Sequence, residues 1–249
     1  MTDAPALQDR VALVVGGAVG LGRGITDGLL AAGASVAVAQ RNQPDELPAG
    51  ARFFGADVRE ADETDRLVNA VVDHHGRLDV VVTGVGGSPQ AAAATAAASW
   101  SRAIVTVNLL APLHVATAAN RVMQGQDEGG AIVTIGSLDA LRPAPGAAAY
   151  GAAKAGLVSL TQSLAAEWGP EVRVNCVSAG VVTADPAAVP GDERDLAEAV
   201  ALGRPGTPAD LAAAVTWLAS PAAAYVSGAN LVVHGGGARP AFLAAIAGS

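Results

Sequence analysis

The sequence is poor in three kinds of residue, and each shortage limits what the protein can be. Its 249 residues contain one cysteine, Cys176, so no disulfide can form within them, which fits a reducing cytoplasm. Aromatic residues make up only 3%, and charged residues make up 15%, below the ~25% typical of soluble domains. Either surface hidden in subunit contacts or the high alanine content would explain the low charge.

Long apolar runs and basic patches are also missing. No uninterrupted apolar run reaches the ~18 residues of a membrane span, and the opening MTDAPALQDR does not resemble a signal peptide. The net charge of -8 argues against general affinity for nucleic acid or anionic lipid. No Cys/His cluster has zinc-ligand spacing. We therefore expect no nucleic-acid partner, no membrane and no metal, and a cytoplasmic location.

Short valine-rich runs alternate with longer helical patterns along the whole chain. The predicted strands are residues 10–17, 35–40, 52–58, 78–86, 130–137, 172–180 and 230–236. The predicted helices are residues 20–33, 61–76, 99–124, 147–168 and 208–219. This alternation is typical of βαβ units, whose right-handed crossovers place helices on both faces of a parallel sheet. We predict one α/β domain over residues 1–249, a doubly wound seven-stranded parallel sheet of the Rossmann type.

Residues 183–205 interrupt this alternation. They are acidic and rich in proline and glycine. We interpret them as a substrate flap or a short helical insert.

Three glycines follow the first predicted strand. Gly16, Gly20 and Gly22 form the pattern G-x-x-x-G-x-G before the next helix. Glycine at such a turn lets the backbone approach a pyrophosphate, while the helix N-terminus offers free N–H groups to the same anion. The alternative is an ordinary glycine-rich turn, but the strand before it and the helix after it favour dinucleotide binding.

A second candidate site lies in the alanine-rich segment YGAAK. Tyr150 and Lys154 are one helical turn apart, so they share a helix face. A tyrosine pKa is normally ~10, and a neighbouring ammonium favours the phenolate. Tyr150 would then exchange a proton with an alcohol or ketone. Ser137 ends the fifth predicted strand 13 residues earlier, at the sheet edge where ligands of such folds bind.

Together these motifs resemble the short-chain dehydrogenase/reductase family. The resemblance covers nearly the whole chain and includes Asn108 in VNLLAP. It implies a catalytic set of Asn108, Ser137, Tyr150 and Lys154. In that reading Tyr150 is the general acid/base, Lys154 lowers its pKa and holds ribose hydroxyls, Ser137 polarises the substrate oxygen, and Asn108 supports a proton relay.

The same resemblance implies which residues hold a nicotinamide cofactor. They are Gly16, Gly20, Leu21, Gly22, Asp57, Val58, Gly86, Tyr150, Lys154, Gly180, Val182 and Thr183. Asp57 would hold the adenine ring, and Val182 or Thr183 would contact the carboxamide.

The chain departs from the family pattern at three segments. Val15 stands at the usual threonine of the glycine turn, and Thr83 and Gly84 replace the two asparagines of N-N-A-G. Ala179 and Ala184 replace the proline and threonine of P-G-x-x-x-T. These changes put local anchoring and the carboxamide contacts in question.

The end of the second strand bears on the choice of cofactor. An acid there would bind a ribose hydroxyl and repel a 2′-phosphate, but the chain has neutral Gln40 and cationic Arg41. An arginine can clamp a phosphate through two charged hydrogen bonds. NADP(H) is therefore favoured over NAD(H). Against this, Val19 lacks the positive charge common in phosphate-binding relatives, and Gln40 could bind a ribose hydroxyl.

The expected activity is hydride transfer between the nicotinamide and a secondary alcohol or ketone. One alternative is reduction of a 3-oxoacyl thioester, for which Arg142 and Arg204 are the candidate carrier-binding cations. The other is a dinucleotide-binding sensor or scaffold without turnover. The resemblance also implies a homotetramer.

Overall fold

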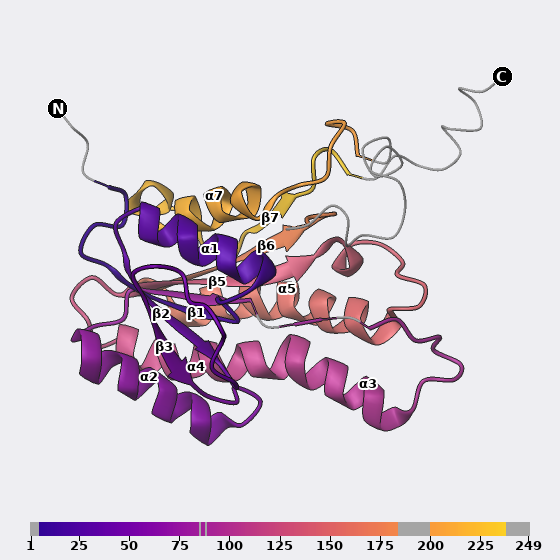
Figure 1. Cartoon of the computed structure of the whole chain (residues 1–249), viewed down its shortest axis with the longest axis horizontal. Coiled ribbons are helices and arrows are strands. Elements are labelled where there is room, and N and C mark those ends of the chain that lie inside the picture. Colours follow the sequence, from indigo (N-terminus) through magenta and orange to yellow (C-terminus); the bar gives the residue numbers. More distant parts are fainter. Residues whose placement is uncertain (1–4, 85, 88, 184–199, 238–249) are drawn as a thin grey trace.

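Seven parallel strands form one sheet at the centre of the molecule. The computed structural model describes residues 5–84, 86, 87, 89–183 and 200–237. The strand order is β3-β2-β1-β4-β5-β6-β7, and every neighbouring pair is parallel (Figure 1). The strands are β1 (Val11–Val15), β2 (Ser35–Gln40), β3 (Ala51–Gly55), β4 (Val80–Thr83), β5 (Gly130–Ser137), β6 (Val172–Ala179) and β7 (Asn230–Val233). The predicted α/β class, strand number and parallel direction are confirmed.

Helices cover both faces of this sheet and enclose two apolar cores. Helices α1 (Gly20–Ala31) and α7 (Pro208–Ala219) lie on one face (Figure 1). Helices α2 (Ala61–His75), α4 (Ala111–Met123) and α5 (Ala148–Trp168) lie on the other. Both faces of the central strands are therefore buried, which explains why they are continuous valine-rich runs rather than alternating ones.

The strand register brings the candidate site together at one edge. The order changes direction between β1 and β4, where Val15 pairs with Thr83. Ser137, the last residue of β5, pairs with Ala179, the last residue of β6. In open parallel sheets the crevice for a ligand lies outside these carboxyl ends. The glycine turn, Ser137 and Gly180 therefore leave the sheet at the same edge.

The stretch predicted as one helix over residues 99–124 is divided in three. Helix α3 (Ala98–Val105) leads into the π-helical segment η1 (Thr106–Leu110) and then into α4. By length and composition this stretch, Ala98–Met123, would suffice to cross a membrane. Its buried side chains pack on the core beside α2 instead, as those of a soluble core helix do.

The predicted flap lies mostly outside the described residues, which omit 184–199. At its two ends Val182 forms an isolated parallel bridge with Gly206, and the Thr183 N–H donates to the Gly206 carbonyl at 3.0 Å. The role of this segment over the substrate stays a prediction.

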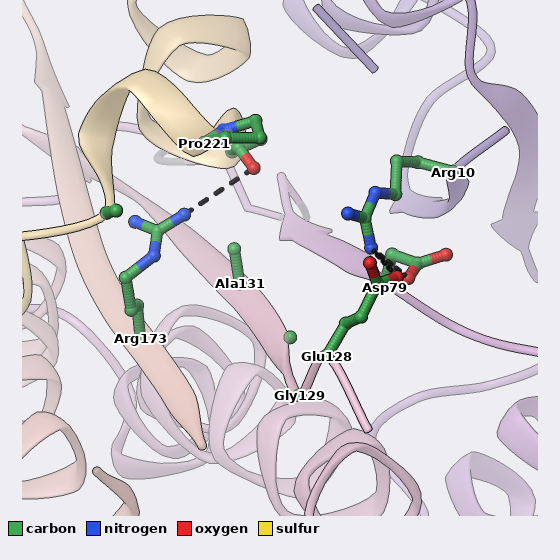
Figure 2. A pocket seen from close by; sticks show the side chains of 10 residues that line it. Arg10, Asp79, Glu128, Gly129, Ala131, Arg173 and Pro221 are labelled. Atoms are coloured by element: carbon green, nitrogen blue, oxygen red, sulfur yellow. Dashed lines mark hydrogen bonds and ion pairs between the residues drawn. The ribbon is translucent and has the colours of Figure 1, made fainter. Parts of the chain in front are cut away.

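A cavity of about 210 Å³ lies at the opposite, amino-terminal edge of the sheet. Figure 2 shows Arg10 and Arg173 on either side of Ala131, with Asp79 and Glu128 beside Arg10. Arg10 pairs with Asp79 at 3.1 Å, and the Arg173 guanidinium donates to carbonyls at the end of α7, among them Leu218 at 2.9 Å. The charged groups here bind one another and the backbone, so we assign this cluster a structural role.

Candidate active site

The glycine turn has the close packing that a phosphate cradle requires. Gly16 and Gly20 have positive φ angles, 75° and 55°, which disfavour any side chain. A Cβ on Gly22 would lie 2.0 Å from the Gly16 carbonyl oxygen, whereas one on Gly20 would meet nothing within 4 Å. Glycine at position 22 lets α1 start against the turn, and the space beside Gly20 is open. Val19, the residue before α1, forms no side-chain cap among the described residues, and the helix begins with Gly20, Leu21 and Gly22.

Backbone contacts and a threonine from α1 anchor this turn where Val15 replaces the usual threonine. The Gly84 N–H donates to the Val15 carbonyl at 3.1 Å, and the Gly16 N–H donates to Ala39 at 2.7 Å. The buried Thr26 hydroxyl donates to the Gly17 carbonyl at 2.8 Å. The turn is therefore held without a side chain at position 15 that forms hydrogen bonds.

A cavity of about 200 Å³ opens beside the turn, at the carboxyl ends of β1, β2 and β3. Its lining includes five of the predicted cofactor residues, together with four that were not predicted: Val15, Gly16, Gln40, Arg41, Ala56, Asp57, Val58, Arg59 and Val107. The Gln40 side chain donates to the Asn42 carbonyl at 2.8 Å, so one of its donors is already used locally. Arg41 is exposed at the rim. The cavity is small, partly apolar and flanked by cations.

Asp57 does not face this cavity as a free carboxylate. The Arg59 side chain donates to both of its oxygens, with Nε at 2.8 Å from Oδ1 and 3.0 Å from Oδ2. This bond, more than any other interaction, lowers the pKa of Asp57. The Asp57 N–H in turn donates to Glu63 Oε2 at 2.7 Å. Arg59 was missed from the sequence, where only the i, i+2 spacing of opposite charges hints at the pair.

Asn108 lies in η1, where the regular helix is interrupted. It is fully buried, and its Nδ2 donates to the Ile104 carbonyl at 3.0 Å and to Gly87 at 3.3 Å. Its Oδ1 is buried, and none of the residues that the structure describes forms a hydrogen bond with it. A Cβ on Gly86 would lie 2.3 Å from this Oδ1 and 3.2 Å from Lys154 Nζ. Glycine at position 86 therefore allows Asn108 and Lys154 to approach the same point.

Lys154 is buried behind Tyr150 on α5. Its side chain is 3% exposed, and its Nζ donates to the Ile135 carbonyl of β5 at 2.8 Å. Nζ lies 5.7 Å from the centre of the Tyr150 ring. Burial lowers the pKa of this lysine from 10.5 to about 8. The predicted sharing of a helix face is confirmed.

Tyr150 and Ser137 meet at the end of β5. Burial raises the pKa of Tyr150, a hydrogen bond with Ser137 opposes that rise, and the charge of Asp139 adds to it. Lys154 is not among the causes of this shift. The chain alone therefore holds Tyr150 as a protonated phenol, whereas the sequence led us to expect that Lys154 would lower the pKa of Tyr150.

The third group of predicted residues follows β6. A Cβ on Gly180 would lie 2.6 Å from His234 Cβ, so the two chain segments touch there. Val182 and His234 line a cavity of about 100 Å³ with Leu202 and Arg204. Gly180 directly follows Ala179, which pairs with Ser137 in the sheet. This segment therefore begins next to Ser137. Its contacts to a carboxamide stay a prediction.

Two further residues have structural positions. His75 closes α2 before Gly76, which adopts the left-handed conformation. Cys176 is buried in β6, and burial raises the pKa of its thiol.

Comparison with known proteins gives consistent matches over almost the whole chain. A family model described as enoyl-(acyl carrier protein) reductase matches residues 16–237. Cyclohexanol dehydrogenase of a Rhodococcus species is 34% identical over 95% of this chain and 98% of the relative. The 3-oxoacyl-[acyl-carrier-protein] reductase MabA of Mycobacterium tuberculosis is 32% identical over 93% of this chain and 94% of the relative.

A solved structure agrees with these sequence matches. A short-chain dehydrogenase/reductase from Serratia marcescens superimposes with a TM-score of 0.84 at 32% identity. The match covers 93% of this chain and 98% of that one.

Proposed function

The chain belongs to the short-chain dehydrogenase/reductase family of oxidoreductases, and from this premise we propose that it reduces ketones to secondary alcohols with NADPH, with Tyr150 as the proton donor. One observation carries the proposal. Asn108 and Lys154 meet beside Gly86, Lys154 lies next to the Tyr150 ring, and Tyr150 forms a hydrogen bond with Ser137, so these residues form one cluster at the carboxyl edge of the sheet. That edge also carries the glycine cradle, whose geometry fits a dinucleotide.

One group of the predicted site residues would bind the cofactor, and another would transfer the proton. The turn at Gly16, Gly20, Leu21 and Gly22 would hold the pyrophosphate, and Gly180, Val182 and Thr183 the carboxamide. A bound nicotinamide cofactor supplies the hydride in reduction and accepts it in oxidation. Lys154 and Tyr150 would bind the nicotinamide ribose beside Gly86.

Tyr150 and Ser137 act on the substrate oxygen. The Ser137 hydroxyl donates a hydrogen bond to a carbonyl oxygen as negative charge develops there. Tyr150 then transfers its phenolic proton to that oxygen. The Asn108 Oδ1, which is buried beside Gly86 and has no hydrogen-bond partner within the described part of the chain, would hold a water molecule that returns a proton through Lys154.

The protonation state of Tyr150 favours reduction as the working direction. Its pKa is raised by burial and by Asp139, so near neutral pH the side chain is a proton donor. Oxidation of an alcohol needs the phenolate, which this environment disfavours until a cationic oxidised cofactor binds.

Arg41 supports NADP(H) over NAD(H). It is exposed at the rim of the 200 Å³ cavity beside the glycine turn, which we propose holds the adenosine of the cofactor and where a guanidinium would pair with a 2′-phosphate. Gln40, engaged with the Asn42 carbonyl, adds no negative charge that would repel one.

The substrate we propose is uncharged and apolar. Leu141 and Leu202 are large side chains exposed to solvent, at 50% and 72%, in the segments that follow Ser137 and precede Gly206. The relative named cyclohexanol dehydrogenase suggests a cyclic ketone as the first compound to assay.

Reduction of a 3-oxoacyl thioester is the second candidate, supported by the relative named MabA. An acidic carrier would need free cations near the entrance. Arg204 is instead bonded to Asp210 at 2.7 Å and 2.9 Å, and Arg142 Nε lies 3.9 Å from Asp139. Both cations have acidic neighbours, so we rank this candidate second.

We further propose that the enzyme is a cytoplasmic homotetramer.

Cofactor titration followed by a substrate panel tests the proposal. NADPH and NADH are titrated by fluorescence, and the tighter-binding one is then assayed with cyclohexanone, linear ketones and a 3-oxoacyl thioester. Tighter NADPH binding with turnover of a ketone supports the proposal. Binding without turnover of any carbonyl would favour a dinucleotide-binding sensor, and equal affinities would refute the role of Arg41.

A further inference from the structure

An apolar groove of about 910 Å³ lies between α1 and α7, which run side by side on one face of the sheet (Figure 1). Its lining residues are mostly alanine and glycine, and Trp217, 43% exposed, is the one aromatic side chain among them. The two helices touch where a Cβ on Gly28 would lie 2.8 Å from that of Ala212. An exposed apolar surface of this kind indicates that another apolar segment covers it.

The chain leaves the sheet beside one end of this groove. Thr207, the N-cap of α7, lines the groove at that end. Asp210, in the first turn of α7, lines the neighbouring cavity of about 100 Å³ together with His234, the residue that follows β7. The described residues end at Gly237, so the tail, residues 238–249, begins close to the amino-terminal end of α7.

The tail is long enough to follow the groove. Residues 238–249 can extend over ~40 Å. Helix α7 has 12 residues and is therefore ~18 Å long. The tail can cross to the groove and run along the whole of α7, even where part of it is helical.

The tail also carries the large side chains that the groove lacks. Its segment AFLAAIA, residues 241–247, is uninterrupted in its apolar character. Phe242, Leu243 and Ile246 are spaced i, i+1 and i+4, which places them on one face of a helix. Walls of alanine and glycine leave room for such side chains, as in complexes where an apolar helix face lies in a groove.

The charges of the two surfaces are complementary. Arg239 is the one charged side chain of the tail, and Asp27 is the one charged side chain among the described residues that line the groove. Asp27 is 54% exposed, and its partner on α1, Arg23, lies 3.3 Å away in a surface ion pair. Such a pair is weak, so the Asp27 carboxylate can also accept hydrogen bonds from Arg239.

We propose that residues 241–247 dock in the groove between α1 and α7 of their own chain, with Phe242, Leu243 and Ile246 against the alanine-rich walls and Arg239 beside Asp27. Docking covers an apolar surface and ties the end of the chain to α7. The inference is independent of the proposed reaction, because no residue assigned to catalysis or to the cofactor lines the groove.

Disulfide trapping tests which segment fills the groove. Cysteine replaces Ala213, an exposed groove residue, and Leu243, while the native Cys176 is buried and stays in place. The matched control combines Leu243→Cys with Ala70→Cys, an exposed alanine of α2 on the opposite face of the sheet. Under mild oxidation the groove pair should form a disulfide within one chain about tenfold or more faster than the control pair, because docking raises the effective concentration of the two thiols.

A third substitution separates docking from chance encounters of a tethered tail. In the protein with both Ala213→Cys and Leu243→Cys, Phe242→Ser should slow trapping severalfold because it removes an apolar contact with the groove. Ala238→Ser, which precedes the apolar segment, should leave the rate unchanged. Circular dichroism confirms that each variant is folded.

The masses of the trapped products identify the occupant. A disulfide within one chain keeps the mass of a single chain, and its rate does not change with protein concentration. Products of doubled mass would show that the tail of a second copy fills the groove, and would overturn docking within one chain. Equal trapping rates for the groove pair and the control pair, or an unchanged rate with Phe242→Ser, would overturn the proposal as well.

Discussion

Replacing Lys154 with methionine should abolish the reaction and yet stabilise the protein near neutral pH. Burial lowers the pKa of Lys154 from 10.5 to about 8, so keeping the ammonium in the folded protein costs ~3 kcal/mol below that pKa. Methionine of similar length removes that cost but also the hydrogen bond to Ile135, worth ~1–2 kcal/mol. The expected net gain in unfolding free energy at about pH 7 is ~1–2 kcal/mol.

The pH dependence of this gain is the sharper part of the prediction. Because the folded pKa lies below the unfolded one, the unfolded wild type binds more protons between about pH 8 and 10.5, and its stability rises through that window. From about pH 7 to pH 9.5 the wild type should gain about 2 kcal/mol relative to the variant, which cancels the difference.

Two assays check it. Urea unfolding of both proteins at the two pH values, at matched subunit concentration, gives the stability difference. Lys154 is the only lysine of the chain, so selective isotope labelling of lysine gives one side-chain NMR signal whose titration reports its pKa directly. A variant less stable than wild type at pH 7, or a difference that does not change with pH, would refute the reasoning.

Two further predictions concern the neighbours of Tyr150 and Lys154. Gly86→Ala should lower kcat by about tenfold or more, because the new Cβ would lie 2.3 Å from Asn108 Oδ1. The circular dichroism spectrum should stay that of the wild type. An unchanged kcat would mean that Asn108 can move at no cost. Asp139→Asn should shift the pH profiles of reduction and oxidation to lower pH, because the Asp139 charge raises the pKa of Tyr150; the exposed Asp65→Asn serves as the control, and profiles that coincide with wild type would show that Asp139 does not act on the phenol.

Much of the fold could be predicted because a parallel strand that is buried on both faces of the sheet has an uninterrupted apolar sequence. Strands β2 and β5 have the predicted ends, residues 35–40 and 130–137. The π-helical geometry around Asn108 could not be read from the spacing of residues, because the change of pitch lies in the backbone hydrogen bonds. Spacing reports which residues are helical, but not a local change of pitch.

The candidate site could likewise be predicted only in part from the sequence. Residue types and spacing placed Tyr150, Lys154 and Ser137 together, but they did not reveal how deeply Lys154 is buried. Desolvation depends on every surrounding element, and here burial raises the pKa of Tyr150, whereas Lys154 is not among the causes of the shift. Arg59 was missed for a different reason: its partner Asp57 is only two residues away, but the cavity that both line also needs the ends of β1 and β2 and Val107 of η1.

The most direct test of the central claim is a single-turnover measurement on Tyr150→Phe. Phenylalanine keeps the ring but removes the proton donor and one proposed contact to the nicotinamide ribose, so the variant is saturated with NADPH before the measurement. Mixing its NADPH complex with cyclohexanone and following nicotinamide absorbance should show hydride transfer slowed by about 10²–10⁴-fold, the usual contribution of a general acid. Hydride transfer at the wild-type rate in this variant would contradict the account.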